Sequence, residues 1–349
     1  MAMPKENINT ILKNPHMYPV AFDGDSCCFV RMDREQFHNS IFTDPPRIKS
    51  INNDSFALQT SSLLDRFFRD KKKSIDCHFI FHTANCGSTL LSRALDFPGV
   101  TIGYREPFTL RQLGVEHNRF QKTGGDLERL WSDKLSLILH LLSRRFSSHE
   151  KPLVKANIPV NFILEEIFSR SKQSKGIFLY ATLEDSLISS LKSEQRRKWV
   201  ATVISQLKDA IVSMPVLSGL SIGYLSIEKL SALLWVVQII KYQDAINQSL
   251  QIKSINSDLF FKQPLEILDA VSAYFGLGIT SEMNEATISS SLFSAYSKNP
   301  NFHYDEAMRE SIRSSALLKF NREIQVGLEW GGELLKKNGY SIDIPNSLI

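Results

Sequence analysis

From residue 77 onward, short apolar runs alternate with stretches of helical periodicity. The apolar runs have the length and composition of buried strands, and they cover residues 78–83, 99–104, 152–157, 176–182 and 251–256. Polar segments with regularly spaced apolar residues separate them. Short apolar strands joined by helices are typical of a parallel sheet covered by helices on both faces, so the pattern predicts an α/β fold.

The helical segments between these strands differ in how clearly they are marked. Leu183, Leu187 and Leu191 recur every fourth residue, which predicts a helix over 183–192. After the strand at 152–157, Pro159 stands where a helix can begin, because proline is well tolerated in a first helical turn.

Residues 1–74 have a different pattern. Two short apolar runs within 18–33 flank a Gly-Asp turn, which predicts a hairpin, and the segment 55–68 has the spacing of a helix. We therefore expect an N-terminal appendage over 1–74, made of a short hairpin and a helix, and a second domain over 75–349.

Composition and charge exclude several classes of protein. Hydrophobic residues make up 43% of the 349 residues, and the net charge of +4 is too small to indicate nucleic acid as a partner. The four cysteines have neither a disulfide-framework nor a zinc-site spacing, so we expect a reducing cytoplasm and no metal. The apolar segment 230–240 is too short to span a bilayer, which predicts a buried helix instead.

The loop after the first of these strands is a candidate anion site. The strand at 78–83 runs into a small-residue turn, and a helix pattern starts at Gly87-Ser88-Thr89. Amides at the start of a helix attract an anion, a glycine permits close approach, and hydroxyls add hydrogen bonds. Arg93 follows one turn later. The alternative is an ordinary strand-to-helix turn that Ser88 caps.

Two other functions of this loop are disfavoured. The loop lacks the Gly-Lys-Ser/Thr triplet of the ATP-binding Walker A motif, since Ser88 follows Gly87 directly. A nucleophilic role for Cys86 is also disfavoured, because His82 is not adjacent to it. Six residues separate Cys86 from Arg93 where a cysteine-dependent phosphatase has five.

Four segments, in order, resemble the sulfotransferases that use phosphoadenosine phosphosulfate (PAPS). Residues 85–90, Asn-Cys-Gly-Ser-Thr-Leu, resemble the 5′-phosphosulfate loop, which reads roughly Lys/Arg-Ser-Gly-Ser/Thr-Thr-Leu in that family. Residues 103–108 resemble the segment that carries a glutamate base, and residues 177–192 the strand and helix that hold the ribose 3′-phosphate. Residues 255–279 resemble a recurrent segment with a proline before a helix. The resemblance covers about residues 77–280.

The resemblance implies a three-layer, P-loop-type α/β fold, with PAPS or its product PAP as the bound nucleotide and roles for specific residues. Glu106 would be the general base, with His82 as an alternative base and Arg105 beside it. The residues implied in nucleotide binding are Thr83, Asn85, Cys86, Gly87, Ser88, Thr89 and Ser189, and from their positions in the sequence we expect Arg93, Lys155 and Lys192 to contribute as nearby cations.

Two departures from the family pattern affect the expected binding of PAPS, the sulfuryl donor. The loop lysine or arginine of the family aligns with Asn85, and the arginine that opens its 3′-phosphate segment aligns with Ala181. Loss of one charge-assisted contact costs about 1.5–3 kcal/mol, so other cations must substitute if PAPS binds. The candidates are Arg93, Arg105, Lys155 and Lys192, the last of which lies one helical turn after Ser189.

These observations predict transfer of a sulfuryl group from PAPS to a hydroxyl or amine of a small molecule or glycan. A second hypothesis is a non-catalytic protein of the same fold that binds a nucleotide or anion, and the departures at Asn85 and Ala181 favour it. A kinase-like phosphotransferase is a third hypothesis, which the missing Gly-Lys-Ser/Thr triplet disfavours. The sequence indicates no oligomeric state.

Overall fold

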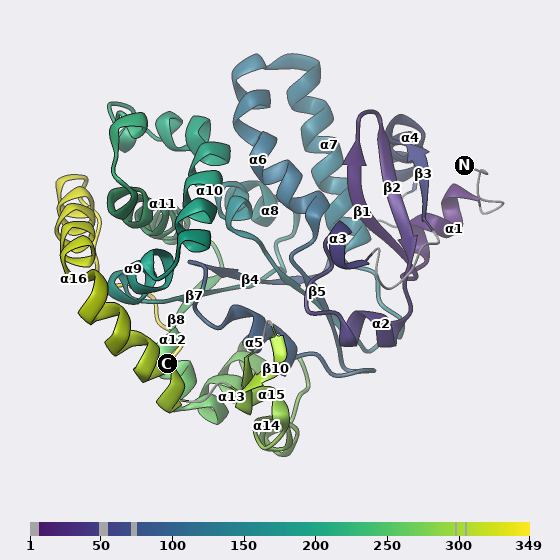
Figure 1. The fold of residues 1–349 in the computed structure, drawn as a ribbon. Helices are drawn as coiled ribbons and strands as arrows, with labels where there is room; N and C mark the ends of the chain where they lie inside the picture. Colours follow the sequence, from purple (N-terminus) through teal and green to yellow (C-terminus); the bar gives the residue numbers. More distant parts are fainter. Residues whose placement is uncertain (1–6, 49–54, 71–74, 297–298, 304–305) are drawn as a thin grey trace. The chain divides into compact units, whose positions relative to one another are not determined.

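The computed structural model describes residues 7–48, 55–70, 75–296, 299–303 and 306–349 and contains a central five-stranded sheet (Figure 1). Its strand order is β5-β6-β4-β7-β8, and β4 and β5 each pair in parallel with β6. The strands are β4 (His78–His82), β5 (Thr101–Arg105), β6 (Lys151–Lys155), β7 (Gly176–Tyr180) and β8 (Ile252–Asn256). Each strand lies where an apolar run predicts it, so the predicted α/β class with a parallel sheet flanked by helices is confirmed.

The chain forms two compact units that do not follow the order of the sequence. The first unit comprises residues 1–80, 91–176 and 272–280, and the second comprises 81–90, 177–271 and 281–349. Strand β4 therefore contributes three residues to the first unit and two to the second. The expected boundary between an appendage and a main domain at residue 74 stays a prediction.

The first unit begins with an antiparallel sheet in the order β1-β2-β3, formed by β1 (Met17–Asp23), β2 (Ser26–Arg31) and β3 (Ser55–Gln59). The predicted hairpin is confirmed, and Gly24 at its turn has a left-handed φ of 52°. The prediction of a helix over 55–68 is wrong at its start. Residues 55–59 pair with β2 instead, and helix α4 begins at Thr60, because main-chain pairing with a neighbouring strand outweighs the local helical spacing.

Helices make up most of the rest of the first unit. Figure 1 shows α6 and α7 beside β1, which both helices contact. The helix predicted from Pro159 starts as a 3₁₀ helix, η1 (Ile158–Ile163), before α8. The other helices are α1 (Ile8–Lys13), α2 (Arg34–Asn39), α3 (Pro45–Ile48), α4 (Thr60–Arg69), α6 (Phe108–Thr123), α7 (Gly125–Leu141) and α8 (Leu164–Arg170). Helices α5 (Ser88–Ala94) and α13 (Pro264–Phe275) have residues in both units.

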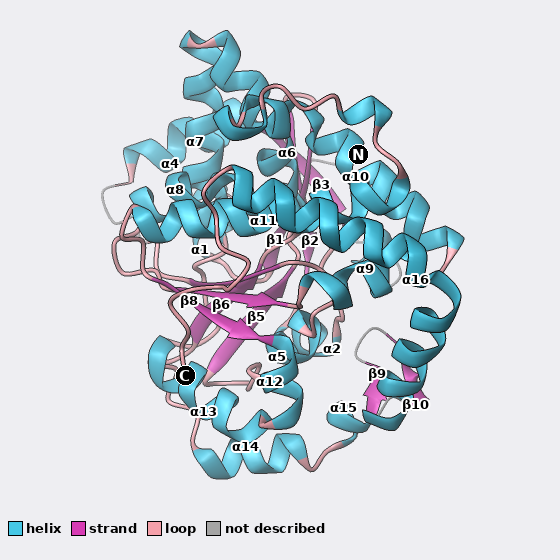
Figure 2. Cartoon of the chain, turned by 90° about the vertical axis from the view of Figure 1, so that its left-hand side faces the viewer, coloured by secondary structure: helices cyan, strands magenta, loops and turns pink. Residues whose placement is uncertain are grey.

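The second unit is built around helices α9, α11 and α16, which pack against one another (Figure 2). A Cβ at Gly327 of α16 would lie 2.6 Å from Leu187 Cδ2 of α9, so the two helices meet at a distance that only glycine permits. Its helices are α9 (Leu183–Leu191), α10 (Glu194–Ser213), α11 (Ile227–Asn247), α12 (Ser257–Lys262), α14 (Ser281–Ile288), α15 (Ser291–Ser294) and α16 (Glu306–Lys337). The short strands β9 (Ala295–Tyr296) and β10 (Asn299–His303) and the 3₁₀ turns η2 (Pro215–Leu217) and η3 (Ile222–Tyr224) complete it.

The most apolar segment of the chain lies within α11. Residues 231–240 are all buried, which confirms the prediction of a buried helix over 230–240 for nearly its whole length. Within the described ranges, no helix combines the length and the hydropathy that a membrane crossing requires.

Candidate functional site

The loop between β4 and α5 has an unusual backbone conformation. Ala84 and Asn85 have φ values of 69° and 51°, and Gly87 has a φ of 84°. Left-handed conformations cost side-chain-bearing residues roughly 1–3 kcal/mol each, and such strain is concentrated at functional sites. Successive residues of this kind also turn main-chain amides toward a common concavity, which is a common anion-binding geometry.

Side chains of the loop itself hold this strained conformation. The main-chain nitrogen of Ala181 donates to Thr83 Oγ1 at 3.1 Å, and that of Ala84 donates to His82 Nδ1 at 3.0 Å. Cys86 Sγ donates to the carbonyl of Leu179 at 3.2 Å. These contacts give His82, Thr83 and Cys86 structural roles in shaping the loop, and they favour such a role for His82 over that of a base.

The groups that the loop leaves available fit an anion. Three main-chain nitrogens of the loop donate no turn, loop or cap hydrogen bond to a backbone carbonyl of the described residues. They belong to Asn85, Gly87 and Ser88. Thr89 is 2% exposed, and its Oγ1 has no hydrogen-bond partner among the described residues. A buried hydroxyl without a partner is costly, so a ligand oxygen here would be stabilised.

A pocket of about 610 Å³ adjoins this loop within the second unit. This volume is within the usual range for small-molecule sites, roughly 300–1,000 Å³. Its lining includes three predicted residues, Asn85, Ser189 and Lys192, which the structure thus brings together. The remaining lining residues are Ala181, Thr182, Glu184, Asp185, Ile188, Ser257, Asp258, Phe261, Lys262, Arg309, Glu310, Ile312 and Arg313.

Two arginines of this pocket already have carboxylate partners. Arg313 of α16 pairs with both Glu184 and Asp185 of α9. One turn earlier, Arg309 Nη1 lies 3.1 Å from Asp258 Oδ1. These pairs neutralise most of the charge that α16 brings to the pocket, so these two arginines are available to an anion only in competition with the carboxylates.

Lys192 and Arg196 differ from them because neither pairs with a carboxylate among the described residues. Arg196 Nη1 donates to Asn85 Oδ1 at 3.0 Å. Desolvation by the surrounding protein, and next the positive charge of Arg196, hold the pKa of Lys192 below its ordinary value. Two neighbouring cations without a carboxylate make the Asn85 side of the pocket electropositive.

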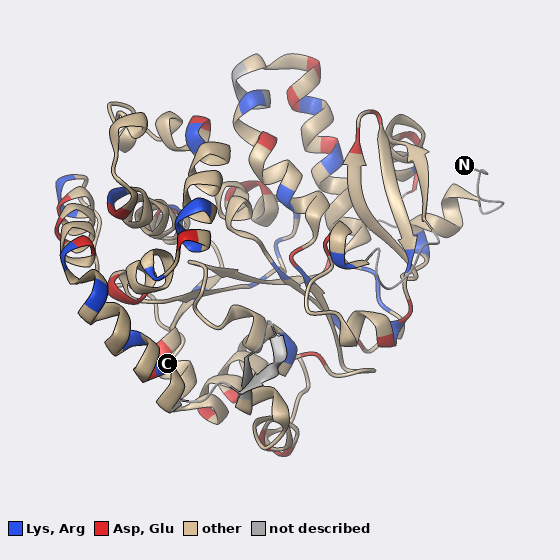
Figure 3. Ribbon diagram, in the orientation of Figure 1, with Lys and Arg blue, Asp and Glu red and all other residues tan. Residues whose placement is uncertain are grey.

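Arg196 is absent from the predicted site residues, although the basic segment 192–199 was visible in the sequence. Its contact with Asn85 joins residues 111 positions apart and cannot be inferred from spacing. Figure 3 shows basic residues on both α10 and α16, so charge alone would not have distinguished Arg196 from its neighbours.

Gly87 is packed against an aromatic ring. A Cβ at this position would lie 2.8 Å from Phe261 Cζ, and Phe261 also lines the pocket.

We expect Gly87→Ala to lower the free energy of unfolding by at least about 1 kcal/mol and to weaken nucleotide binding, since it adds both strain and a clash. Urea unfolding and titration with PAP measure the two effects. Gly219→Ala, where nothing lies within 4 Å, is the matched control, and equal behaviour of the two variants would contradict this packing.

In the first unit, Glu106 lies in a second strained position directly after β5. Its φ is 57°, and its main-chain nitrogen donates to the carbonyl of Lys155 at 2.7 Å. Its carboxylate pairs with Lys155 Nζ and accepts a hydrogen bond from Asn157 Nδ2 at 3.3 Å. Lys155 is 1% exposed whereas the Glu106 side chain is 25% exposed, so the lysine is a buried counter-ion and the carboxylate remains partly accessible.

Arg105 belongs to a buried network within the first unit. Its guanidinium pairs with Asp96, and not with its sequence neighbour Glu106, and it donates to the carbonyls of Phe37 and Ser40. Arg105 is 0% exposed, which favours a structural role. Arg93 also belongs to the first unit and is half-buried. Burial, followed by the charge of Arg105, lowers its pKa.

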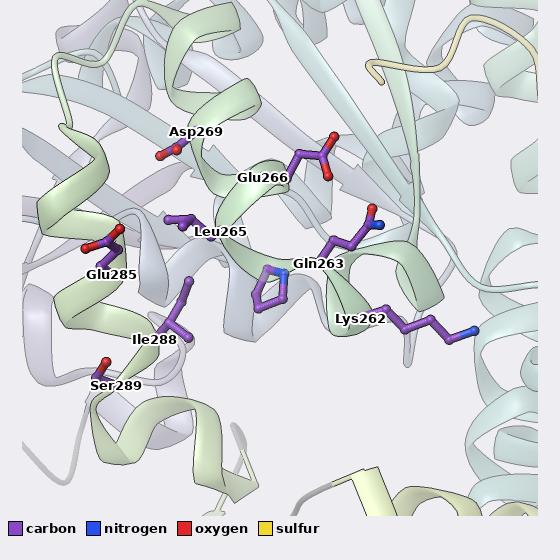
Figure 4. A pocket seen from close by; sticks show the side chains of 9 residues that line it. Lys262, Gln263, Leu265, Glu266, Asp269, Glu285, Ile288 and Ser289 are labelled. Carbon is purple, nitrogen blue, oxygen red and sulfur yellow. The ribbon is translucent and has the colours of Figure 1, made fainter.

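A second hollow of the second unit lies between α13 and α14 (Figure 4). Figure 4 shows Glu266, Asp269 and Glu285 around it, and it shares only Lys262 with the pocket beside Asn85. Asp269 accepts hydrogen bonds of 2.7 Å from Ser281 Oγ and Asn284 Nδ2, and these bonds stabilise the first turn of α14. Among the described residues, no group of three or more His, Cys, Asp or Glu side chains is arranged to hold a metal.

No protein-family model matches this chain, and a search of curated proteins gives no match. Solved structures similar to it include the sulfotransferase domain from the curacin biosynthetic pathway, which is 13% identical with a TM-score of 0.39 over 77% of this chain and 99% of that chain. Mouse sulfotransferase SULT7A1 complexed with PAP is 12% identical, with a TM-score of 0.40 over 81% and 91%. A sulfotransferase from Alicyclobacillus acidocaldarius is 12% identical, with a TM-score of 0.33 over 73% and 98%. At these sequence identities and TM-scores, the similarity describes the path of the polypeptide chain and gives no evidence about its chemistry.

Proposed function

We propose that this protein binds PAPS and transfers its sulfuryl group to a hydroxyl or amine of a small molecule or glycan. The observation that carries the proposal is the pocket beside the strained loop, where Lys192 has no carboxylate partner among the described residues. It unites Asn85 of the loop, Ser189 of the segment that resembles the family's 3′-phosphate segment, and Lys192, a candidate substitute cation. All four cysteines lie in the described part of the chain and form no disulfide bond, which fits the reducing cytoplasm included in this proposal.

In this proposal, the two units have separate tasks. PAPS supplies an activated sulfuryl group, whose transfer depends mainly on positioning and on stabilisation of negative charge. The loop around Gly87 and the Ser189 hydroxyl bind the phosphate groups, and Lys192 adds positive charge. Glu106 removes the proton of the acceptor hydroxyl or amine, and Lys155 and Asn157 orient its carboxylate.

A non-catalytic nucleotide- or anion-binding protein is the second candidate. The observation that favours it is the presence of Glu184, Asp185 and Asp258 in the pocket, because carboxylates repel a phosphate unless their arginine partners outweigh them. A kinase-like phosphotransferase has no comparable support, since the loop lacks a lysine between Gly87 and Ser88.

Thermal unfolding with different ligands, followed by an activity assay, separates these candidates. We expect PAP and PAPS to raise the midpoint of thermal unfolding, and ATP with magnesium to leave it unchanged. Release of PAP from PAPS in the presence of a panel of hydroxyl and amine acceptors then supports transfer. Stabilisation by PAP without turnover on any acceptor favours the second candidate, and stabilisation by ATP with magnesium alone would contradict the proposal.

A further inference from the structure

The first turn of helix α10 contains an arginine, Arg196, in an electrostatically unfavourable place. The helix starts at Glu194, and Ser193 Oγ caps it by accepting from the main-chain nitrogen of Arg196 at 3.3 Å. The first turn of a helix carries a partial positive charge, so a cation there is destabilising. Arg196 therefore opposes the stability of its own helix, as does Arg197 in the same turn.

The neighbouring basic residues each have a carboxylate partner, whereas the partner of Arg196 is neutral. Arg197 Nη2 lies 3.8 Å from Glu323 Oε1, and its Nε donates to the carbonyl of Leu191 at 2.9 Å. Lys198 Nζ lies 3.7 Å from Glu194 Oε1. The side-chain hydrogen bond of Arg196 is to the amide oxygen of Asn85, which carries no charge. The positive charge of Arg196 therefore lies beside the loop and is not neutralised by this hydrogen bond.

We propose that Arg196 supplies the positive charge that loop position 85 lacks, and that it binds, together with Lys192, a phosphate group of the ligand. Asn85 acts as the anchor that fixes the guanidinium beside the loop. An anion bound there would neutralise two neighbouring cations, neither of which pairs with a carboxylate among the described residues. The ligand class is a phosphate ester or pyrophosphate. The assignment of that phosphate to PAPS rests on the proposed function.

The test compares two substitutions that remove one positive charge from the same helical turn. Arg196→Gln keeps a donor for Asn85 but removes the charge. Lys198→Gln removes an exposed charge, since that side chain is 76% exposed. Isothermal titration at low ionic strength measures the affinity for PAP and for inorganic pyrophosphate. We expect Arg196→Gln to weaken both about tenfold or more, Lys198→Gln to change neither more than about twofold, and Arg196→Lys to recover most of the loss.

A purely structural role would have a different signature. If Arg196 only held the loop through its hydrogen bond to Asn85, Arg196→Gln would keep that donor and leave both affinities near those of wild type. Under the proposal, both affinities fall, while the unfolding temperature of the ligand-free protein is unchanged or higher, because a cation leaves the first turn. Equal affinities of wild type and Arg196→Gln, or no recovery in Arg196→Lys, would overturn the inference while the proposed function stands.

The two proposals can also fail separately in the other direction. Pyrophosphate binding that depends on Arg196, without any binding of PAP, would support the inference and contradict the proposed function. A wild-type protein that binds neither pyrophosphate nor PAP would overturn both.

Discussion

Glu106→Gln is expected to reduce the rate of sulfuryl transfer about 100- to 10,000-fold and to leave the affinity for PAP unchanged. Glutamine keeps the size of the side chain and can still contact Lys155, but it cannot accept the acceptor's proton, and general base catalysis contributes about this factor. In our proposal, residues of the second unit bind the nucleotide. We therefore expect this substitution to change the rate of sulfuryl transfer without changing the affinity for PAP. Steady-state kinetics and titration with PAP measure the two quantities.

Controls for this substitution address the loss of an ion pair. Lys155 is buried and loses its charged partner, so the assay is run well below the variant's own unfolding temperature. Glu106→Asp keeps the charge but shortens the side chain, and we expect an intermediate rate. Glu128→Gln, at an exposed position of α7, should behave as wild type. A Glu106→Gln protein that is folded and transfers sulfate at the wild-type rate would exclude Glu106 as the base.

Asp96→Asn is expected to lower the free energy of unfolding by about 3–5 kcal/mol. Asp96 is the carboxylate partner of fully buried Arg105 and also pairs with Arg34, so the substitution leaves a buried guanidinium without its counter-charge. Urea unfolding at neutral pH measures the change. Asp133→Asn, which removes a surface pair of 4.0 Å with Arg129, is the control and should cost no more than about 1 kcal/mol.

The difference in free energy of unfolding between wild type and Asp96→Asn should depend on pH in a definite direction. Burial by itself raises the pKa of the Asp96 carboxyl, but Arg105, followed by His38 and Arg34, outweighs burial and holds this pKa below its ordinary value. The carboxylate therefore contributes stability above the unfolded-state pKa of about 4, and this contribution is lost as the pH falls through the lower folded-state pKa. The difference between wild type and Asp96→Asn should shrink on acidification. A difference that is small at neutral pH or grows in acid would contradict the structural role of the Asp96–Arg105 pair.

The fold was predictable wherever burial leaves a local trace in the sequence. Strands His78–His82 and Gly176–Tyr180 are buried along nearly their whole length and therefore appear as continuous apolar runs. Helix α9 was marked by leucines at every fourth position. Strand β3 was missed because its pairing with β2 depends on residues about thirty positions away, whereas its own sequence continues the helical spacing of α4.

The candidate site was predictable only in its local parts. The small-residue loop and Ser189 were recognisable by type and order, and the structure gathers Asn85, Ser189 and Lys192 around one pocket. The partners of charged residues were not predictable, because a salt bridge depends on tertiary contacts. Arg105 pairs with Asp96 instead of its sequence neighbour Glu106, and Arg196 reaches Asn85 from the start of α10.

The central claim is that the strained loop after β4 and the adjoining pocket bind a phosphorylated nucleotide. A crystal structure of the protein grown with PAP tests it most directly. We predict a phosphate oxygen within about 3.2 Å of the main-chain nitrogens of Gly87 and Ser88, and a second phosphate in contact with Ser189 and Lys192. PAP bound at another place, or a loop that remains without ligand at saturating PAP, would contradict the account.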